Sequence, residues 1–257
     1  MILAIDIGNT NIVIGCIRGE KILFVERMST DNDKTVLEYA IGFKTVLELY
    51  HIQPKELTGS IISSVVPPVT NTVKEAIQKI TSHNVMVVGP GLRTGLNILM
   101  DDPGTTGSDL IVNAVAAIAE YKPPLIIFDL GTATTVSVVD QKKNYIGGMI
   151  LPGINVSLDG LISHTSQLRK ISIESPKKVI GTNTSDCMKS GVIYGNAACM
   201  DGIVERIEEE LGEKATVLAT GGLASLVTSY CRKEIILDDT LLLKGLRLIY
   251  LKNCDKQ

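Results

Sequence analysis

The sequence predicts an α/β fold made of two similar halves, each a mixed sheet of five strands with flanking helices. Two observations lead to this prediction. Asp6 and Asp129 each follow a short apolar run, each open an Asp-x-Gly turn, and each precede a second β-prone run. In both halves, strands and amphipathic helices then follow in a similar order. A hairpin that opens both halves of the chain indicates an internal duplication.

The first half begins with three antiparallel strands and continues with alternating helices and strands. Strands are expected over residues 1–5, 12–17, 21–27, 59–66 and 85–88. Helices are expected over residues 35–50, 69–80 and 109–121, where apolar residues recur with helical spacing. We therefore expect an N-terminal domain over residues 1–121.

The second half, residues 122–257, repeats this order around a longer connection. Strands are expected over residues 125–128, 135–139, 145–150, 216–220 and 234–237, and the clearest helices over 185–211 and 241–251. Ser63 and Thr220 correspond, because each ends the strand that follows the three opening strands of its half. The extra residues of the second half lie at about 152–189. We expect this inserted segment to form a lid or a partner-facing surface.

Composition excludes several classes of function. The 257 residues carry a net charge of −3, so neither a nucleic-acid-binding face nor a polybasic membrane anchor is expected. No signal peptide and no membrane-spanning stretch is expected. The five cysteines form no C-x-x-C pair, which is typical of reduced thiols in a cytoplasmic protein.

The two Asp-x-Gly turns have the chemistry of a phosphate-binding site. Gly131 allows close approach of the backbone to a ligand, and threonine hydroxyls and turn amides donate to phosphate oxygens. A single tight turn uses the same residue types, so one copy alone carries little weight. The chain has no G-x-x-x-x-G-K-[ST] motif, so a P-loop is excluded and the two hairpins are the candidates for this role.

Five motifs occur in an order that resembles the type III pantothenate kinase family. They are Asp6–Thr10, Gly107–Asp109, Asp129–Thr135, Gly147–Ile154 and Thr220–Ala224. Shorter phrases at Ser63–Pro68, Val88–Gly91 and Gly95–Ile98 are also similar to that family. The resemblance covers nearly the whole chain. It implies duplicated ribonuclease H-like domains of the actin-like ATPase type. It also implies a homodimer whose active sites lie between domains and near the dimer interface.

The same resemblance implies residues that bind nucleotide and cations. The residues implied for ATP are Asp6, Ile7, Gly8, Asn9, Thr10, Asn11, Ile12, Val13, Thr132, Gly221 and Gly222. Asp129 matches the position that holds a monovalent cation, K⁺ or NH₄⁺, and Asp6 would orient Mg²⁺ or its waters. The alternative for Asp129 is a turn-capping residue, and for Gly221 and Gly222 a simple entry turn to a helix.

Asp109 is the candidate general base. In phosphoryl transfer an aspartate accepts the proton of the attacking alcohol. From its chemistry alone, Asp109 fits an N-terminal cap of the following helix better than a base. The match to the family's Gly-x-Asp reverses that preference and favours the base. The residues implied for substrate are Met100, Gly107, Ser108, Asp109, Leu110 and Thr184, the last reaching the neighbouring subunit's site.

Two positions depart from the family pattern. Leu110 stands where the family usually has arginine, and Met100 where it often has tyrosine. Loss of one charge-assisted contact to the substrate carboxylate costs about 1.5–3 kcal/mol. Arg93, Arg169 or Lys170 are candidates to replace that contact. His164, in the inserted segment, is expected to be a solvated or capping residue.

The resemblance implies ATP-dependent phosphorylation of pantothenate to 4'-phosphopantothenate, the first step of coenzyme A biosynthesis. Leu110 and Met100 keep two alternatives open. One is a non-catalytic, nucleotide-binding regulatory member of the same family. The other is a kinase of another small alcohol.

Overall fold

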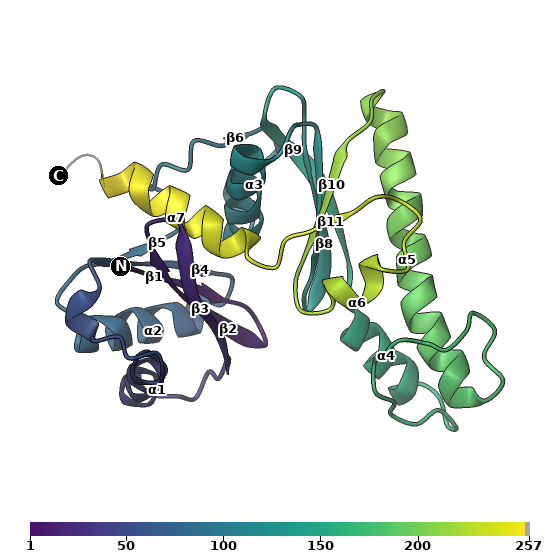
Figure 1. Cartoon of the computed structure of the whole chain (residues 1–257), viewed down its shortest axis with the longest axis horizontal. Coiled ribbons are helices and arrows are strands. Elements are labelled where there is room, and N and C mark those ends of the chain that lie inside the picture. The colour runs from purple at the N-terminus through teal and green to yellow at the C-terminus, as the bar shows by residue number, and fades with distance from the viewer. Residues whose placement is uncertain (255–257) are drawn as a thin grey trace. The chain divides into compact units, whose positions relative to one another are not determined.

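Two mixed sheets carry the fold, and the computed structural model describes them within residues 1–254. The chain forms two compact units (Figure 1). Unit 1 comprises Met1–Leu96, Asp101–Ala116 and the segment that begins at Leu241; unit 2 comprises Asn97–Met100 and Ala117–Thr240.

Unit 1 is built on a five-stranded sheet in the order β3-β2-β1-β4-β5. The strands are β1 (Ile2–Ile7), β2 (Asn11–Arg18), β3 (Lys21–Ser29), β4 (Gly59–Ser64) and β5 (Val85–Val87). The central strand β1 pairs antiparallel with β2 and parallel with β4. The helices are α1 (Val36–Leu49), α2 (Pro67–Ile80), α3 (Ser108–Glu120) and α7 (Leu241–Cys254), with short 3₁₀ turns η1 (Pro54–Glu56) and η2 (Pro103–Thr105). The last turn of α3, from Ala117 on, falls in unit 2.

The alternation of side chains along β1 explains why this sheet is covered on both faces. Leu3, Ile5 and Ile7 belong to a core that includes buried residues of α1 and α2. Ile2 and Ala4 point to the opposite face, where buried residues of α3 and α7 pack. A central strand buried on both faces reads as a continuous apolar run, as residues 1–5 do.

Helix α7 belongs to unit 1, although the sequence placed it in the second half. Tyr250 packs on Gly59 and its hydroxyl donates to the carbonyl oxygen of Thr58 at 3.2 Å. A Cβ at Gly245 would lie 2.1 Å from the carbonyl oxygen of Val112 in α3. The unit boundaries therefore differ from the expected division at residue 121, because the last helix returns to cover the first sheet.

Unit 2 is built on a six-stranded sheet in the order β11-β10-β7-β8-β9-β6. The strands are β7 (Leu125–Leu130), β8 (Ala133–Val139), β9 (Asn144–Pro152), β10 (Thr216–Thr220), β11 (Ile236–Leu237) and β6 (Asn97–Ile98). Five of them are the expected strands. The sixth, β6, comes from the first half of the chain and pairs parallel with β9.

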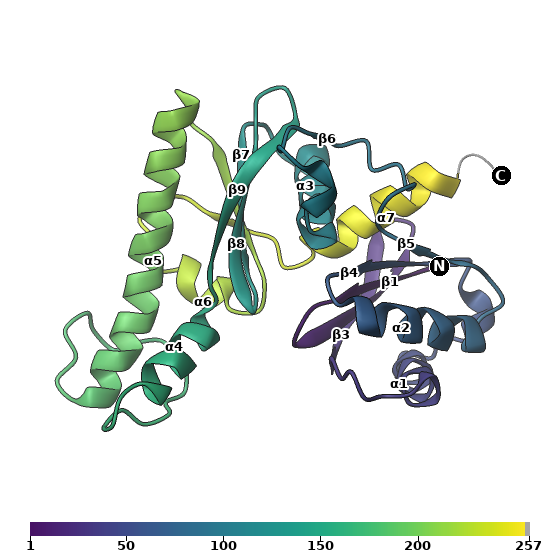
Figure 2. The ribbon, with the colours of Figure 1, turned by 180° about the vertical axis from the view of Figure 1, so that it is seen from behind.

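Three helices pack on one face of this second sheet: α4 (Ile154–Ser163), α5 (Thr184–Leu211) and α6 (Ala224–Thr228). Figure 2 shows the long helix α5 running alongside the sheet, with α4 and α6 near it. The expected inserted segment contains α4 and a stretch, residues 164–183, without helix or strand. Glu174 and Val179 of this stretch are held to α5 by Lys189 and Ser190 respectively.

The register of the two sheets confirms the correspondence between the halves. Ser63 is the parallel partner of Asp6, and Thr220 is the parallel partner of Asp129. The turns differ in length, however. Ile7 pairs with Ile12 across residues 8–11, whereas Leu130 pairs with Thr134 across residues 131–133. The second hairpin is therefore one residue tighter than the first. Within residues 1–254, no helix has both the length and the apolar composition needed to cross a bilayer.

Candidate active site

The first hairpin presents its polar turn to solvent and buries the residues on either side. Asn9, Thr10 and Asn11 are exposed, whereas Ile7 and Ile12 have no exposed surface. The amide of Gly8 donates to the carbonyl oxygen of Asn11 at 3.0 Å, which closes the turn. Among the residues implied for ATP, Ile7 and Ile12 therefore anchor the turn in the core and expose no surface of their own.

A neighbouring strand end holds this first turn in place. The hydroxyl of Thr30, which directly follows β3, donates to the carbonyl oxygen of Gly8 at 2.6 Å. The amide of Thr30 donates to the carbonyl oxygen of Thr10 at 2.9 Å. The turn is thus fixed from outside the hairpin, which leaves its side chains preorganised for contact with a ligand.

The second hairpin is held by the residues that follow β9. The amide of Gly153 donates to the carbonyl oxygen of Thr132 at 3.1 Å. A Cβ at Gly153 would lie 2.1 Å from that oxygen, so only glycine permits this close approach. Gly131 and Thr132 are exposed at the tip. The hydrogen bond from Gly153 therefore holds the β7–β8 turn in place, while Gly131 and Thr132 remain exposed at its tip.

Gly221 lies next to Asp129, so the structure brings together two predicted site positions of unit 2. Gly221 follows β10, which pairs parallel with β7, and has φ +99°. A Cβ there would lie 2.7 Å from the backbone nitrogen of Leu130 and 2.8 Å from Oδ1 of Asp129. Glycine at this position keeps the carboxylate of Asp129 and the turn beside it accessible.

Asp109 lies in the first turn of α3 and is half-buried. Its Oδ1 accepts from the amide of Leu110 at 2.9 Å. Burial raises the pKa of this carboxyl above its ordinary value, and hydrogen bonds from the backbone oppose that shift in pKa. A carboxylate whose pKa is raised is a stronger base than an ordinary aspartate, which suits proton abstraction.

Gly107 has a direct steric role beside the candidate base. A Cβ on Gly107 would lie 2.5 Å from Oδ1 of Asp109. The first residue of the Gly-x-Asp motif is therefore glycine because the carboxylate folds back over it. Ser108, between them, uses its hydroxyl to bond the end of β4.

The remaining predicted substrate residues are distributed over both units. Leu110 is half-buried in α3 of unit 1. Met100 belongs to unit 2, where Gly147 of β9 approaches its sulfur; a Cβ on Gly147 would lie 3.6 Å from Sδ. Thr184 is exposed at the start of α5, where Asn183 caps the helix.

The basic residues considered as replacements for the family's arginine lie on loops. Arg93 is in unit 1, and both its amide and its carbonyl bond the side chain of Asn253 in α7. Arg169 and Lys170 are exposed in unit 2, within residues 164–183. His164 is the exposed C-cap of α4, which confirms the predicted capping role.

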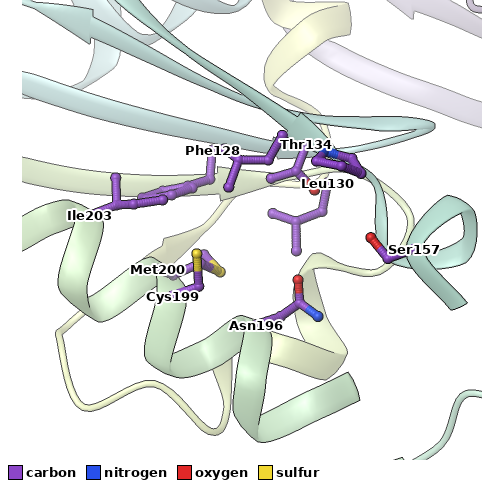
Figure 3. Close-up of a pocket in the computed structure, with 10 residues that line it drawn as sticks. Phe128, Leu130, Thr134, Ser157, Asn196, Cys199, Met200 and Ile203 are labelled. Carbon is purple, nitrogen blue, oxygen red and sulfur yellow. The ribbon is translucent and has the colours of Figure 1, made fainter. Parts of the chain in front are cut away.

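A cavity of about 150 Å³ lies behind the second hairpin, on the side of the sheet that faces α5 (Figure 3). Phe128, Leu130 and Thr134 line it from the hairpin, and Asn196 and Ile203 from α5. Because side chains alternate along a strand, Asp129 points to the opposite face. None of the predicted site residues lines this cavity, so it is separate from the candidate active site.

The carboxylates of the candidate site do not form a cluster of the kind that encloses a metal. Among residues 1–254, no group of three or more His, Cys, Asp or Glu side chains is arranged to hold a metal ion. Each hairpin supplies one aspartate instead. This arrangement fits a magnesium ion held by one carboxylate together with phosphate oxygens, which is how Mg²⁺ is bound in nucleotide sites.

Comparison with known proteins agrees with this geometry. The family model described as type III pantothenate kinase matches residues 2–206. A type III pantothenate kinase from Exiguobacterium sp. is 46% identical, covering 98% of this chain and 99% of that protein. One from Halalkalibacterium halodurans is 44% identical, covering 98% of this chain and 100% of that protein.

Solved structures with the same fold are more distant in sequence. The Acidaminococcus fermentans (R)-2-hydroxyglutaryl-CoA dehydratase component A has a TM-score of 0.59 at 14% identity, covering 99% of this chain and 98% of its own. The Clostridium difficile activator of 2-hydroxyisocaproyl-CoA dehydratase, solved with ADPNP, has a TM-score of 0.53 at 12% identity, covering 98% and 94%. These likenesses concern the fold alone, two mixed sheets with flanking helices. Over the length of its sequence, the chain belongs to the type III pantothenate kinase family.

Proposed function

We propose that this protein transfers the γ-phosphoryl group of ATP to pantothenate, giving 4'-phosphopantothenate and ADP at the first step of coenzyme A biosynthesis. Membership of the family supports this activity. The single structural observation that carries it is Asp109, a half-buried carboxyl with a raised pKa at the start of α3. A protein that only bound nucleotide would have no use for such a base.

The chain's own residues account for the proton and for the charge of the phosphates. Asp109 accepts the proton of the pantothenate hydroxyl as its oxygen attacks the γ-phosphorus, and ADP leaves. We assign the phosphate oxygens to exposed amides and hydroxyls of the β1–β2 turn, within Asp6–Val13, and to Thr132 of the β7–β8 turn. Gly221 and Gly222 leave room for adenosine. Because little covalent chemistry is asked of the protein in phosphoryl transfer, positioning of these groups supplies most of the catalysis.

The aspartates of the two hairpins are the residues to which we assign the cations. Asp6 is the residue we assign to Mg²⁺, and Asp129 the residue we assign to K⁺ or NH₄⁺. When bound, these ions neutralise charge on the phosphates. We expect activity to require a divalent and a monovalent cation, and Asp129→Asn to raise the potassium concentration needed for half-maximal activity while Asp109→Asn does not.

The acceptor side of the site is formed by Gly107–Leu110 and Met100, with Thr184 as the contribution of a second subunit. Leu110 offers no charge to the carboxylate of pantothenate. We expect Leu110→Arg to lower KM for pantothenate by about 10- to 150-fold, the effect of one charge-assisted bond of about 1.5–3 kcal/mol. Leu110→Met is the matched control. For a pantothenate analogue that has a hydroxyl in place of the carboxylate, Leu110→Arg should not lower KM.

The dimer and the cellular location are further parts of this proposal. Ile150, Val179 and Ile180 of unit 2 are among the most exposed large apolar residues, at 77%, 60% and 78%. We assign them to a homodimer interface. Light scattering should give twice the mass of one chain, and Ile180→Asp should reduce it. The free thiols of all five cysteines suit the reducing cytoplasm.

The deciding experiment measures ADP release by the purified protein with ATP, Mg²⁺ and K⁺, with and without pantothenate. Pantothenate-dependent turnover that disappears in Asp109→Asn supports the kinase. ATP binding without pantothenate-dependent ADP release at millimolar pantothenate overturns it, and points to a non-catalytic relative or to another alcohol. Activity retained in Asp109→Asn overturns the role of that residue alone.

A further inference from the structure

The hydroxyl of Ser108 makes an unusual set of contacts at the end of β4. It donates to the carbonyl oxygen of Ser64 and accepts from the amide of the same residue, each at 3.0 Å. The hydroxyl of Ser63, which has no exposed surface, lies 3.0 Å away as a third partner. One side chain therefore satisfies both backbone groups of Ser64.

The position of Ser64 in the sheet explains why these groups need a partner. Val65 donates its amide to Ile7 of β1 at 3.1 Å, so the backbone groups of Ser64 point the other way, toward β5. The ladder between β4 and β5 ends at Ile62, which pairs with Val87. Beyond that point none of the strands within residues 1–254 pairs with β4 on this side, and the hydroxyl of Ser108 takes the place of the missing ladder residue.

This contact connects the candidate base to the first phosphate-binding hairpin. Ser108 directly precedes Asp109 in α3. Ser63 and Ser64 are the parallel partners of Asp6 and Ile7, the residues with which β1 enters the turn. All of these residues belong to unit 1. The distance between Asp109 and the Asp6 turn is thus set through Ser108 and two adjacent strands.

We infer that Ser108 is a positioning residue, whose hydroxyl fixes the first turn of α3 on β4 and so holds Asp109 where it meets the acceptor hydroxyl. This inference rests on the proposed kinase function. It gives Ser108, placed above within the substrate-binding stretch, the specific role of holding its neighbour Asp109. Removing the hydroxyl leaves two backbone groups of Ser64 and one hydroxyl of Ser63 without their shared partner, and the first turn can shift.

The test compares four variants with the wild type. Ser108→Ala removes the hydroxyl, Ser108→Thr keeps it, and Ser63→Ala removes only one of its three partners. Thr70→Val is the matched control, since Thr70 bonds the side chain of Ser64 at 2.6 Å and does not touch Ser108. For each we would measure kcat, KM for ATP, thermal unfolding, and the pH dependence of kcat/KM for pantothenate.

The expected result is a loss confined to the chemical step. Ser108→Ala should lower kcat by about 10- to 100-fold, the effect of misplacing a catalytic group by roughly 1 Å, with KM for ATP within about 2-fold of wild type. The acidic limb of its kcat/KM profile for pantothenate should move to lower pH, because a displaced Asp109 becomes better hydrated and its pKa falls. Ser63→Ala should lower kcat and move the acidic limb of kcat/KM in the same direction as Ser108→Ala, but by less. Ser108→Thr, which keeps the hydroxyl, should recover most of the kcat that Ser108→Ala loses.

Three outcomes would overturn the inference. One is Ser108→Ala with wild-type kcat and pH profile. Another is Thr70→Val with the same losses as Ser108→Ala, which would make the effect one of general stability. The third is a lower unfolding temperature in Ser63→Ala and Ser108→Ala with kcat and the pH profile unchanged. A wild-type protein without pantothenate-dependent turnover is a different result, since it defeats the proposed function itself.

Discussion

Gly221 and Asp129 lie against each other at the ends of two neighbouring parallel strands, β10 and β7, so that a Cβ at Gly221 would lie 2.8 Å from Oδ1 of Asp129. The sequence assigned Asp129 to a monovalent cation and Gly221 to adenosine. Their contact means that the proposed cation position and the proposed adenosine position of unit 2 depend on the same few atoms.

Gly221→Ala is therefore expected to damage both stability and nucleotide binding. The added methyl meets the backbone nitrogen of Leu130 at 2.7 Å, and alanine is strained at φ +99°. We expect the free energy of unfolding to fall by about 1–3 kcal/mol and KM for ATP to rise. Denaturant unfolding and initial rates measure the two effects. Gly195→Ala in α5, where a Cβ meets nothing within 4 Å, is the control. Equal behaviour of the two variants would contradict the prediction.

Asp109→Asn is expected to stabilise the protein while it abolishes catalysis. Burial raises the pKa of Asp109 in the folded state, so its stabilising contribution is complete below the unfolded pKa and is lost as pH rises through the folded pKa. At neutral pH the wild type therefore carries a cost that asparagine lacks, about 1.4 kcal/mol for each unit by which the pKa is raised.

Denaturant unfolding at pH 7.5 and pH 4 tests this sign. The stability advantage of Asp109→Asn should be present at pH 7.5 and should shrink as pH falls through the raised folded-state pKa of Asp109. Asp159→Asn, which changes an exposed carboxyl in α4, provides the comparison. An advantage of the same size at both pH values would argue against burial of the charge as its cause.

His83 is expected to make the protein less stable in mild acid. Its Nε2 lies 2.8 Å from the hydroxyl of Ser60, a residue without exposed surface, and burial lowers the pKa of the imidazole. A lowered folded-state pKa means that the stability contribution of neutral His83 is present above pH 6.5 and is lost as pH falls through the folded pKa.

His83→Gln should flatten this dependence. We expect the wild type to lose stability between pH 7 and pH 5 and the variant to lose less, because glutamine can still bond Ser60 but does not titrate. The exposed His164→Gln serves as the control and should follow the wild type. If all three proteins show the same slope of unfolding free energy against pH, His83 is not the titrating group.

Gly245→Ala is expected to be among the most destabilising single changes in unit 1. Its methyl group would lie 2.1 Å from the carbonyl oxygen of Val112, a backbone atom of α3 that has no rotamer to change. We expect a loss of about 1–3 kcal/mol, together with lower activity because α3 carries Asp109. Gly15→Ala is a useful contrast. There the methyl meets the δ carbons of Leu243 at 2.6 and 2.8 Å, and a flexible side chain can move. A smaller loss for Gly245→Ala than for Gly15→Ala would contradict this assignment.

The sequence alone was sufficient for the elements whose pattern is local. The apolar runs before Asp6 and Asp129, the helical spacing over residues 185–211 and the correspondence of Ser63 with Thr220 all appear in the structure. Strand period, helix period and turn chemistry each depend on neighbours in the chain, so they can be read without the fold. The family followed from the order of five short motifs.

Tertiary structure decided what depends on contacts between distant residues. Residues 97–98 join the second sheet by pairing with β9. A strand this short has no side-chain period in the sequence, so only its pairing reveals it. Helix α7 joins the first sheet, because glycines at 59 and 245 allow Tyr250 and α3 to approach closely. The second turn is one residue shorter than the first, since the register of β7 with β8 sets it. In the same way, the resemblance of Gly107–Asp109 to the family motif predicted a base, and only the structure showed that the serine between them bonds Ser64 beyond the end of the β4–β5 ladder.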